Sequence, residues 1–288
     1  MYKLIAIDLD GTLFDSYGEI SKENIDAIKY AINKGVEVVL ASGREPQSIK
    51  RTSLALGIEN YLIAGNGASV YSINEDKNIY ESYINKKKAL EIIEKCKKNS
   101  MFLNVYTNRG IITERLEYNV KVFNSENNYK SQEKRTNIEI IEDIYQYVEN
   151  HEIDILKIII CDNDKIIFNN IVQKLKEIPN VDVLDIEHMS KKMIKIGTED
   201  INIEYYYTEI TNKNTDKWDA IDFLIKELNI KKEETVCIGD NINDKKMIEN
   251  AGIGIAMRGS ILELMKIGDY ITDDNNSSGV AKAIYKYI

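Results

Sequence analysis

Short apolar runs alternate with helical patterns along the first third of the chain. The runs with the length of buried strands are Leu4–Ile7, Val36–Ala41 and Tyr61–Ala64. After the first run, Ser21 can cap a helix whose apolar face carries Ile25, Ile28 and Ile32, and a second helix ends near Gly57. Strands that are separated by helices indicate βαβ units. This third of the chain therefore predicts a parallel sheet.

The last third repeats the same pattern. It predicts strands at 235–238, 252–257 and 270–272, and helices at 218–228, at 243–250 and from Gly279 to the end. Because these elements also alternate, we expect them to join the sheet of the first third. The fold class that follows is α/β.

The middle of the chain has a different pattern. It predicts helices at 86–99, 138–150 and 165–177, and extended segments at 102–106, 110–113, 156–160 and 181–186. The polar run 121–135 predicts a solvated loop, and the stretch 187–204 has no clear pattern. We interpret the middle, residues 84–206, as a second α/β unit inserted into a core made of residues 1–83 and 207–288.

Composition narrows the possible functions. The 288 residues carry a formal net charge of −9, which argues against binding to nucleic acid or to an anionic membrane. No run is long enough for a membrane span, and acidic residues follow the first strand at once, so we expect no signal peptide. The 3 cysteines form no metal-binding spacing and predict reduced thiols in the cytoplasm. A small phosphorylated metabolite remains a possible partner, because a local cation overrides the net charge.

Polar residues gather where the predicted core strands end. Asp8 and Asp10 follow the first strand, and further clusters follow three other strands at 42–44, 65–67 and 240–244. Ligand sites of open α/β sheets form at the carboxyl ends of the strands, so these clusters predict one common site. Gathered carboxylates repel one another unless a cation neutralises them, and Mg²⁺ prefers oxygen ligands. One carboxylate could then attack phosphorus while another transfers protons.

The same segments carry a family resemblance. Residues 8–13 (DLDGTL), 41–44 (ASGR) and 239–247 (GDNINDKKM) resemble, in order, motifs of the haloacid dehalogenase superfamily of phosphohydrolases. The sequence AGIGIAM at 251–257 is similar to that of its Cof-type branch. Lys217 matches the remaining motif, although Asn214 and Trp218 stand where the family usually has glycine, and Arg258 also departs from the pattern. The resemblance implies a Rossmann-like parallel sheet with helices on both faces and an inserted α+β cap that selects the substrate.

The resemblance also implies the roles of the catalytic and metal-binding residues. Asp8 would be the nucleophile and a metal ligand. Asp10 would be the general acid and base, and its backbone carbonyl would bind the metal. Lys217 would stabilise charge on the phosphoryl group. Asp240 would bind Mg²⁺, with Asp244 positioning the residues around the ion.

Further residues are candidates for binding the substrate. Ser42 would bind phosphate, Asn243 would lie near the phosphate, and Gly43 is a weaker candidate. Asn66 and Gly67 would either line the rim of the site or serve only as turn residues. Arg44 has two interpretations, because it could contact the substrate or pair with a surface acid. Three functions remain open: a phosphatase of small phosphorylated metabolites, a phosphotransferase or phosphomutase with the same intermediate, and a phosphate-binding protein without catalysis.

Overall fold

The chain forms two compact units. The computed structural model describes residues 1–130, 132, 135–184, 189–196 and 199–288. The first unit contains Met1–Glu81 and Thr215–Ile288, and the second contains Ser82–Asn214. The sequence pattern places the junctions at 83/84 and 206/207. Strand β12 (Glu199–Asn212) runs through the later of these positions without a break, so the second unit extends to its end.

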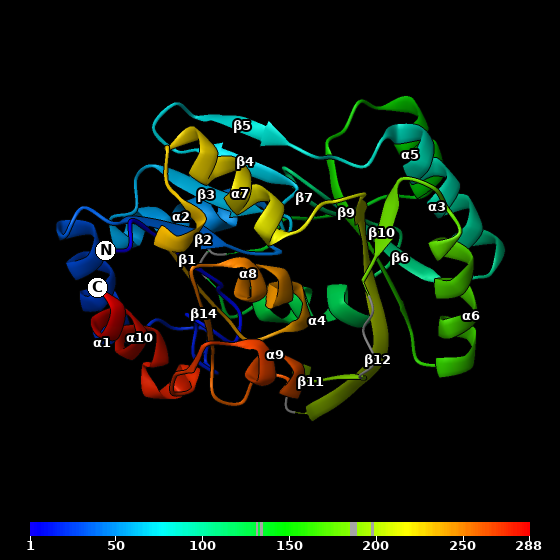
Figure 1. Cartoon of the computed structure of the whole chain (residues 1–288). Helices are drawn as coiled ribbons and strands as arrows, with labels where there is room; N and C mark the ends of the chain where they lie inside the picture. Colours follow the sequence, from blue (N-terminus) through cyan, green and yellow to red (C-terminus); the bar gives the residue numbers. More distant parts are fainter. Residues whose placement is uncertain (131, 133–134, 185–188, 197–198) are drawn as a thin grey trace. The chain divides into compact units, whose positions relative to one another are not determined.

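The first unit is built on an eight-stranded sheet with the order β15-β14-β13-β1-β2-β3-β4-β5. Strands β1 to β5 and β14 of this sheet are labelled in Figure 1. The parallel strands are β1 (Leu4–Ile7), β2 (Glu37–Ala41), β3 (Tyr61–Ala64), β13 (Thr235–Gly239), β14 (Ile253–Ala256) and β15 (Tyr270–Ile271). Two antiparallel strands, β4 (Ser69–Ser72) and β5 (Lys77–Glu81), extend one edge. The sequence analysis did not predict this pair, because polar residues interrupt both short segments.

Helices cover both faces of this sheet, which confirms the predicted fold class. Side chains of α1 (Lys22–Asn33), α2 (Pro46–Leu56) and α10 (Gly279–Tyr287) pack on Ile5, Ile7 and Leu40. On the opposite face, α7 (Lys217–Glu227), α8 (Lys245–Asn250) and α9 (Leu262–Ile267) pack on Leu4, Ala6 and Val39. The apolar runs predicted as strands are therefore buried on both sides, as parallel strands are.

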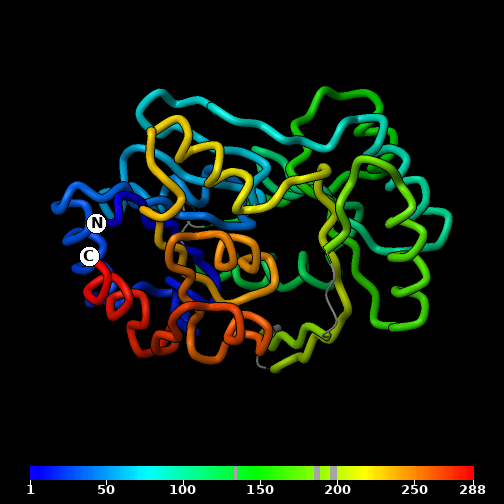
Figure 2. Tube along the Cα trace, in the orientation of Figure 1, coloured from blue at the N-terminus to red at the C-terminus, as the bar shows by residue number. Residues whose placement is uncertain are grey.

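Local signals set the helix ends. The Ser21 side chain accepts a hydrogen bond from the backbone N–H of Asn24 and begins α1, as predicted. Helix α2 begins at Pro46 and ends at Leu56, and Gly57 terminates it in the left-handed conformation with a φ of 80°. The two chain ends lie close together in the first unit (Figure 2). The rings of Tyr2 and Tyr287 lie 6.1 Å apart.

The second unit has a mostly antiparallel sheet, in which β7 and β8 pair in parallel, and three helices pack on one of its faces. Its order is β10-β12-β9-β6-β7-β8, with β11 paired to β12 alone. The strands are β6 (Phe102–Thr107), β7 (Gly110–Thr113), β8 (Ile138–Ile140), β9 (Ile155–Asp162), β10 (Val181–Val183) and β11 (Ser190–Ile196). Leu103, Val105 and Ile158 pack under α3 (Lys86–Lys98), α5 (Ile144–Asn150) and α6 (Lys165–Lys176).

Two segments of the second unit differ from their predictions. The run predicted as a solvated loop at 121–135 contains most of helix α4 (Tyr118–Asn127), and residues 131, 133 and 134 lie outside the described part. Polarity misled the prediction because a buried hydrogen bond from Asn104 to Asn119, 3.0 Å long, ties α4 to the sheet. The helix predicted at 138–150 is instead strand β8 followed by α5, because Asp143 caps a new helix.

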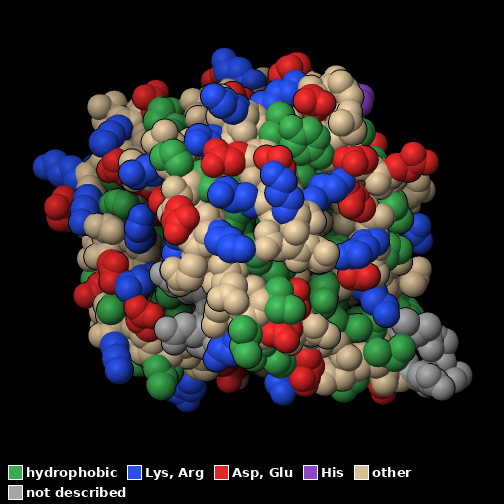
Figure 3. Space-filling view, turned by 90° about the vertical axis from the view of Figure 1, so that its right-hand side faces the viewer, with side chains coloured by type: hydrophobic (Ala, Val, Ile, Leu, Met, Phe, Trp, Pro, Cys, Tyr) green, Lys and Arg blue, Asp and Glu red, His purple; other side chains and the backbone are tan. Residues whose placement is uncertain are grey.

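The stretch without a clear pattern is a hairpin. Strand β11 pairs antiparallel with the first half of β12, in the register Ser190↔Tyr205 to Ile196↔Glu199. The strand predicted at 181–186 is described as β10, which ends at Val183, and residues 185–188 lie outside the described part. Lys and Arg side chains are interspersed with Asp and Glu on the face seen in Figure 3.

Two further predictions concern membranes and thiols. Within the described residues, no helix has the length and apolar character needed to cross a membrane. Cys96, Cys161 and Cys237 are buried free thiols, in keeping with the absence of any metal-binding spacing among them.

Candidate active site

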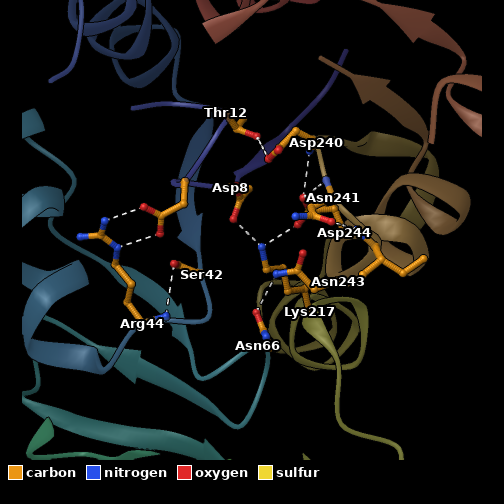
Figure 4. A network of polar contacts seen from close by, with 12 residues as sticks. Asp8, Thr12, Ser42, Arg44, Asn66, Lys217, Asp240, Asn241, Asn243 and Asp244 are labelled. Carbon is orange, nitrogen blue, oxygen red and sulfur yellow. Dashed lines mark hydrogen bonds and ion pairs between the residues drawn. The ribbon is translucent and has the colours of Figure 1, made fainter. Parts of the chain in front are cut away.

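The predicted site residues of the first unit lie at the carboxyl ends of neighbouring strands (Figure 4). Asp8 follows β1, Ser42 follows β2, Asn66 lies two residues beyond β3, and Asp240 follows β13. Because β13, β1, β2 and β3 are parallel neighbours, their carboxyl ends share one edge of the sheet. Four segments that are far apart in the sequence thus reach one place.

A buried lysine joins two of the carboxylates. The ammonium group of Lys217 lies 2.5 Å from Oδ1 of Asp8 and 2.6 Å from Oδ1 of Asp244. Lys217 is the first residue of α7, and its side chain is 0% exposed. Because the side chain is buried, these contacts hold the ammonium group in place. It therefore fixes the positions of both carboxylates relative to α7.

The second oxygen of Asp244 organises the loop that follows β13. It accepts hydrogen bonds from the backbone N–H groups of Asp240 (2.9 Å) and Asn241 (3.0 Å). These bonds close a short 3₁₀ turn, η3 (Ile242–Asp244). Both oxygens of Asp244 are thus engaged by the protein, and this side chain holds Asp240 in place.

Asp240 completes a group of three carboxylates. Its Oδ1 accepts a hydrogen bond of 2.9 Å from the hydroxyl of Thr12, which the sequence analysis did not single out although it lies in the DLDGTL segment. One oxygen each from Asp8, Asp240 and Asp244 lie within 4.8 Å of one another. Oxygen donors at this spacing can bind a divalent cation.

The electrostatics of the cluster also fit a cation. Burial and the charge of Asp244 raise the pKa of Asp8 well above its usual range, although Lys217 opposes the rise. The same two causes raise the pKa of Asp240 to about 6. Burial lowers the pKa of Lys217, but the charges of Asp244 and Asp8 raise it by more, so the lysine remains an ammonium. One ammonium beside two buried carboxylates and a partly buried third leaves an excess negative charge, which a divalent cation would neutralise.

Three glycines provide the space in which these groups meet. A Cβ atom on Gly11 would lie 2.4 Å from Oδ2 of Asp240, and one on Gly239 would lie 2.5 Å from Cγ of Asp244. A Cβ on Gly67 would lie 1.9 Å from the backbone oxygen of Asp216, the residue before Lys217. Gly67 also has a φ of +98°, which favours glycine. It therefore allows the loop after β3 to approach the start of α7.

Asp10 forms an ion pair with Arg44. The Arg44 guanidinium donates to Oδ2 of Asp10 through Nε (2.8 Å) and to Oδ1 through Nη2 (2.5 Å). Arg44 was expected either to contact the substrate or to pair with an acidic residue. The structure shows such a pair, and the acidic residue is Asp10, itself a predicted site residue. Ser42 is buried, and its hydroxyl accepts a hydrogen bond of 3.3 Å from the backbone N–H of Arg44. Gly43 is the partly exposed residue between them.

The remaining candidates form a pair beside Lys217. The side-chain amide of Asn243 donates to Oδ1 of Asn66 at 3.0 Å, so the loops after β3 and β13 are joined. Asn66 has a φ of 59°, in the left-handed region that asparagine tolerates better than most residues. Apart from Gly43, for which no contact is described, every predicted residue has a defined partner or close approach.

The departures from the family pattern are accommodated locally. Asn214 has a φ of 56°, a conformation in which asparagine is the usual substitute for glycine. Trp218 packs at the edge of the apolar cluster that contains Ala220 and Leu224, with the Lys232 ammonium 5.6 Å from its ring centroid. Arg258 pairs with Asp273 at 3.0 Å. None of these contacts involves the buried cluster around Lys217.

Comparison with known proteins agrees with this geometry. Residues 5–284 match the family of haloacid dehalogenase-like hydrolases. The chain is 30% identical over 289 residues to the phosphatase YwpJ of Bacillus subtilis (97% of both chains), and 29% identical to the 5-amino-6-(5-phospho-D-ribitylamino)uracil phosphatase YcsE of the same species (99% of this chain, 96% of YcsE). A solved haloacid dehalogenase-like hydrolase from B. subtilis superposes with a TM-score of 0.82 at 26% identity, covering 99% of this chain and 100% of that one. The chain therefore belongs to the haloacid dehalogenase-like hydrolase family, and it is a phosphatase.

Proposed function

We propose that the protein hydrolyses phosphate monoesters of small metabolites in a Mg²⁺-dependent reaction, with Asp8 as the nucleophile. The observation that carries this proposal is the buried Asp8 carboxylate, which lies 2.5 Å from the Lys217 ammonium and within 4.8 Å of two further carboxylates. A nucleophile held beside a cation at the edge of the sheet suits attack on an anionic phosphate, since the cation offsets their mutual repulsion.

The cluster has the donors that Mg²⁺ requires. Asp8 and Asp240 would bind the ion through their carboxylates, and Asp10 through its backbone carbonyl, while Asp244 keeps Asp240 in place through the bonds described above. The raised pKa values of Asp8 and Asp240 support this assignment, because they indicate negative charge that the protein alone leaves uncompensated. When bound, Mg²⁺ supplies positive charge to a phosphate oxygen and to the carboxylates.

The reaction has two steps. In the first, an oxygen of Asp8 forms a bond to phosphorus while the bond between phosphorus and the leaving oxygen breaks, and Asp10 donates a proton to that oxygen. In the second, Asp10 takes a proton from water, the water oxygen attacks phosphorus, and the bond to Asp8 breaks to release inorganic phosphate. Lys217 and the Ser42 hydroxyl stabilise the charge on the phosphoryl oxygens throughout.

The second unit would select the substrate. The family resemblance implies this role for residues 84–206, and inserted units of this kind exclude water and recognise the leaving group. YcsE acts on a phosphorylated ribitylamino-uracil, and this relative supports a search among sugar phosphates and cofactor precursors. The buried thiols fit the reducing conditions of the cytoplasm, where such metabolites occur.

The first experiment is a phosphate-release assay with an aryl phosphate, run with Mg²⁺ and with a chelator. We expect turnover only with Mg²⁺, and acid-quenched protein should carry a phosphoryl group on the peptide that contains Asp8. Release without Mg²⁺, or a phosphoryl group on another residue, would contradict the proposal. A screen of metabolite phosphates, with and without a sugar as acceptor, then distinguishes a phosphatase from a phosphotransferase by the product formed.

A further inference from the structure

Arg44 contacts Asp10 in a geometry that fixes the carboxylate. Nε donates to one carboxylate oxygen and Nη2 to the other, at 2.8 and 2.5 Å, and these two bonds are drawn from Arg44 in Figure 4. A two-point contact restricts rotation of the carboxylate, which a single hydrogen bond does not. The Asp10 side chain is 58% exposed, so packing alone does not hold it.

The arginine is itself held on a second side. Its guanidinium carbon lies 4.9 Å from the centroid of the Phe14 ring. Phe14 belongs to the same loop as Asp10, and the two residues form a β-bridge. The Phe14 backbone is fixed by a hydrogen bond to the carbonyl of Leu9 (2.9 Å), and its own carbonyl accepts one from Asn275 (2.8 Å). The ring therefore sets the position of the guanidinium.

The backbone of Arg44 is anchored to the turn after β2. Its N–H donates to the Ser42 hydroxyl at 3.3 Å, and its carbonyl accepts a hydrogen bond of 3.0 Å from the N–H of Gly65. The side chain thus links the turn after β2 to the loop after β1. Both ends of this link belong to the first unit.

We propose that Arg44 is a positioning residue that orients Asp10 for proton transfer, and that it is not a ligand of the substrate. The inference rests on the proposed function, in which Asp10 is the acid and base. Proton transfer requires the acid to lie within hydrogen-bond reach of the leaving oxygen, so a freely rotating carboxylate would act less often. A lysine cannot replace the arginine, because an ammonium lacks the planar pair of donors.

A kinetic double-mutant cycle tests this inference. The four proteins are wild type, Asp10→Asn, Arg44→Met and the double variant. For each, we measure the single-turnover rate at which an alkyl phosphate releases its alcohol, a poor leaving group, in the presence of Mg²⁺. Arg44→Met should slow release by roughly 10- to 100-fold, less than the loss of Asp10 itself. In the Asp10→Asn background, the same substitution should change the rate by less than about 2-fold, because the two residues act through one function.

The leaving group and matched variants separate positioning from other roles. With an aryl phosphate, whose leaving group needs no acid, Arg44→Met should slow release by only about 3-fold or less. Arg44→Lys should lose most of the alkyl rate, and Phe14→Leu part of it. Arg51→Met is the control, because Arg51 is 40% exposed, close to the 36% of Arg44, and pairs with Glu45 instead of Asp10. It should leave both rates unchanged.

The alternative outcomes are distinct. If the effects of Arg44→Met and Asp10→Asn were additive, or if Arg44→Met raised KM for both esters in both backgrounds, Arg44 would be a substrate ligand. Either result would overturn the inference but leave the proposed function intact. Equal losses with alkyl and aryl phosphates would indicate a general structural defect and would also overturn it. Absence of turnover in the wild-type protein would instead overturn the proposed function, and the inference with it.

Discussion

The two units place their charged residues in different parts of their sheets. In the first unit, Asp8 and Asp240 follow the ends of parallel strands, where the backbone turns and a ligand can approach. In the second unit, Lys157 and Glu209 lie within strands β9 and β12 and pair with each other at 2.9 Å. The Lys157 side chain is 4% exposed, and its ammonium lies 4.8 Å from the centroid of the Tyr106 ring.

This difference indicates what each set of charges does. The charges at the site of the first unit are only partly compensated, since Lys217 contacts two of three clustered carboxylates. In the second unit, the charges of Lys157 and Glu209 compensate each other. A cluster of side chains with a net charge is suited to binding an ion or a substrate, whereas a pair of opposite charges that neutralise each other serves to maintain the fold. The following predictions test this contrast, from the largest expected effect to the smallest.

Asp8→Asn should have the largest effect on catalysis. We expect kcat for an aryl phosphate to fall on the order of 10⁴-fold or more, because the amide is not a nucleophile and the two steps depend on it. The matched change in the second unit is Asp162→Asn. Asp162 lies at the end of β9, and its Oδ1 accepts a hydrogen bond of 2.8 Å from the Asp164 N–H, which an amide oxygen also accepts. That variant should keep kcat within about 3-fold, and a comparable loss in both would contradict the contrast.

Lys157→Met should instead affect stability. Removing one partner of a buried pair leaves Glu209 uncompensated, so the free energy of unfolding should fall by about 3–5 kcal/mol. Denaturant unfolding measures this change. Replacing Glu209 as well, in Lys157→Met/Glu209→Leu, should restore part of the loss. If Lys157→Met left stability unchanged but abolished turnover, the pair would belong to the substrate site.

Gly67→Ala tests whether backbone contact positions Lys217. The new Cβ would overlap the Asp216 carbonyl at a φ of +98°, so we expect a loss of about 2–4 kcal/mol in stability and a lower kcat. Gly57→Ala is the control, since Gly57 has a φ of +80° and nothing within 4 Å of the added atom. It should cost about 1 kcal/mol and leave kcat unchanged. Equal kcat for the two variants would show that the approach of Gly67 to α7 is unimportant.

The smallest effect concerns protons and metal at Asp240. The pKa of Asp240 is raised to about 6 in the folded protein, above its value in the unfolded chain, so the folded state binds the proton more tightly. Without Mg²⁺, wild type should therefore gain stability relative to Asp240→Asn as the pH falls from 7 toward 4. Mg²⁺ at pH 7 should raise the Tm of wild type by roughly 2–6 °C and that of the variant by less. Thermal scans at several pH values check both trends.

The sequence predicted the first unit better than the second. The buried runs such as Leu4–Ile7 and the helix signals at Ser21 and Gly57 are local, and each produced the expected element. The prediction of a loop at 121–135 failed, because helix α4 begins before this run and the hydrogen bond between Asn104 and Asn119 ties the helix to strand β6. The hairpin of β11 and β12 was missed although Ile201, Ile203 and Tyr205 alternate with polar residues, because charged residues such as Lys191, Lys192 and Asp200 interrupt the apolar pattern before them.

The site divides in the same way. The sequence by itself determined which residue types stand after each strand, and the order of these segments indicated the family before any contact was known. Only the tertiary structure decided that Asn243 contacts Asn66, that Gly67 makes room for the start of α7, and that Arg44 contacts Asp10. The physical reason is that residue type follows from local chemistry, whereas partners more than 30 residues apart meet only when the strands pack into one sheet.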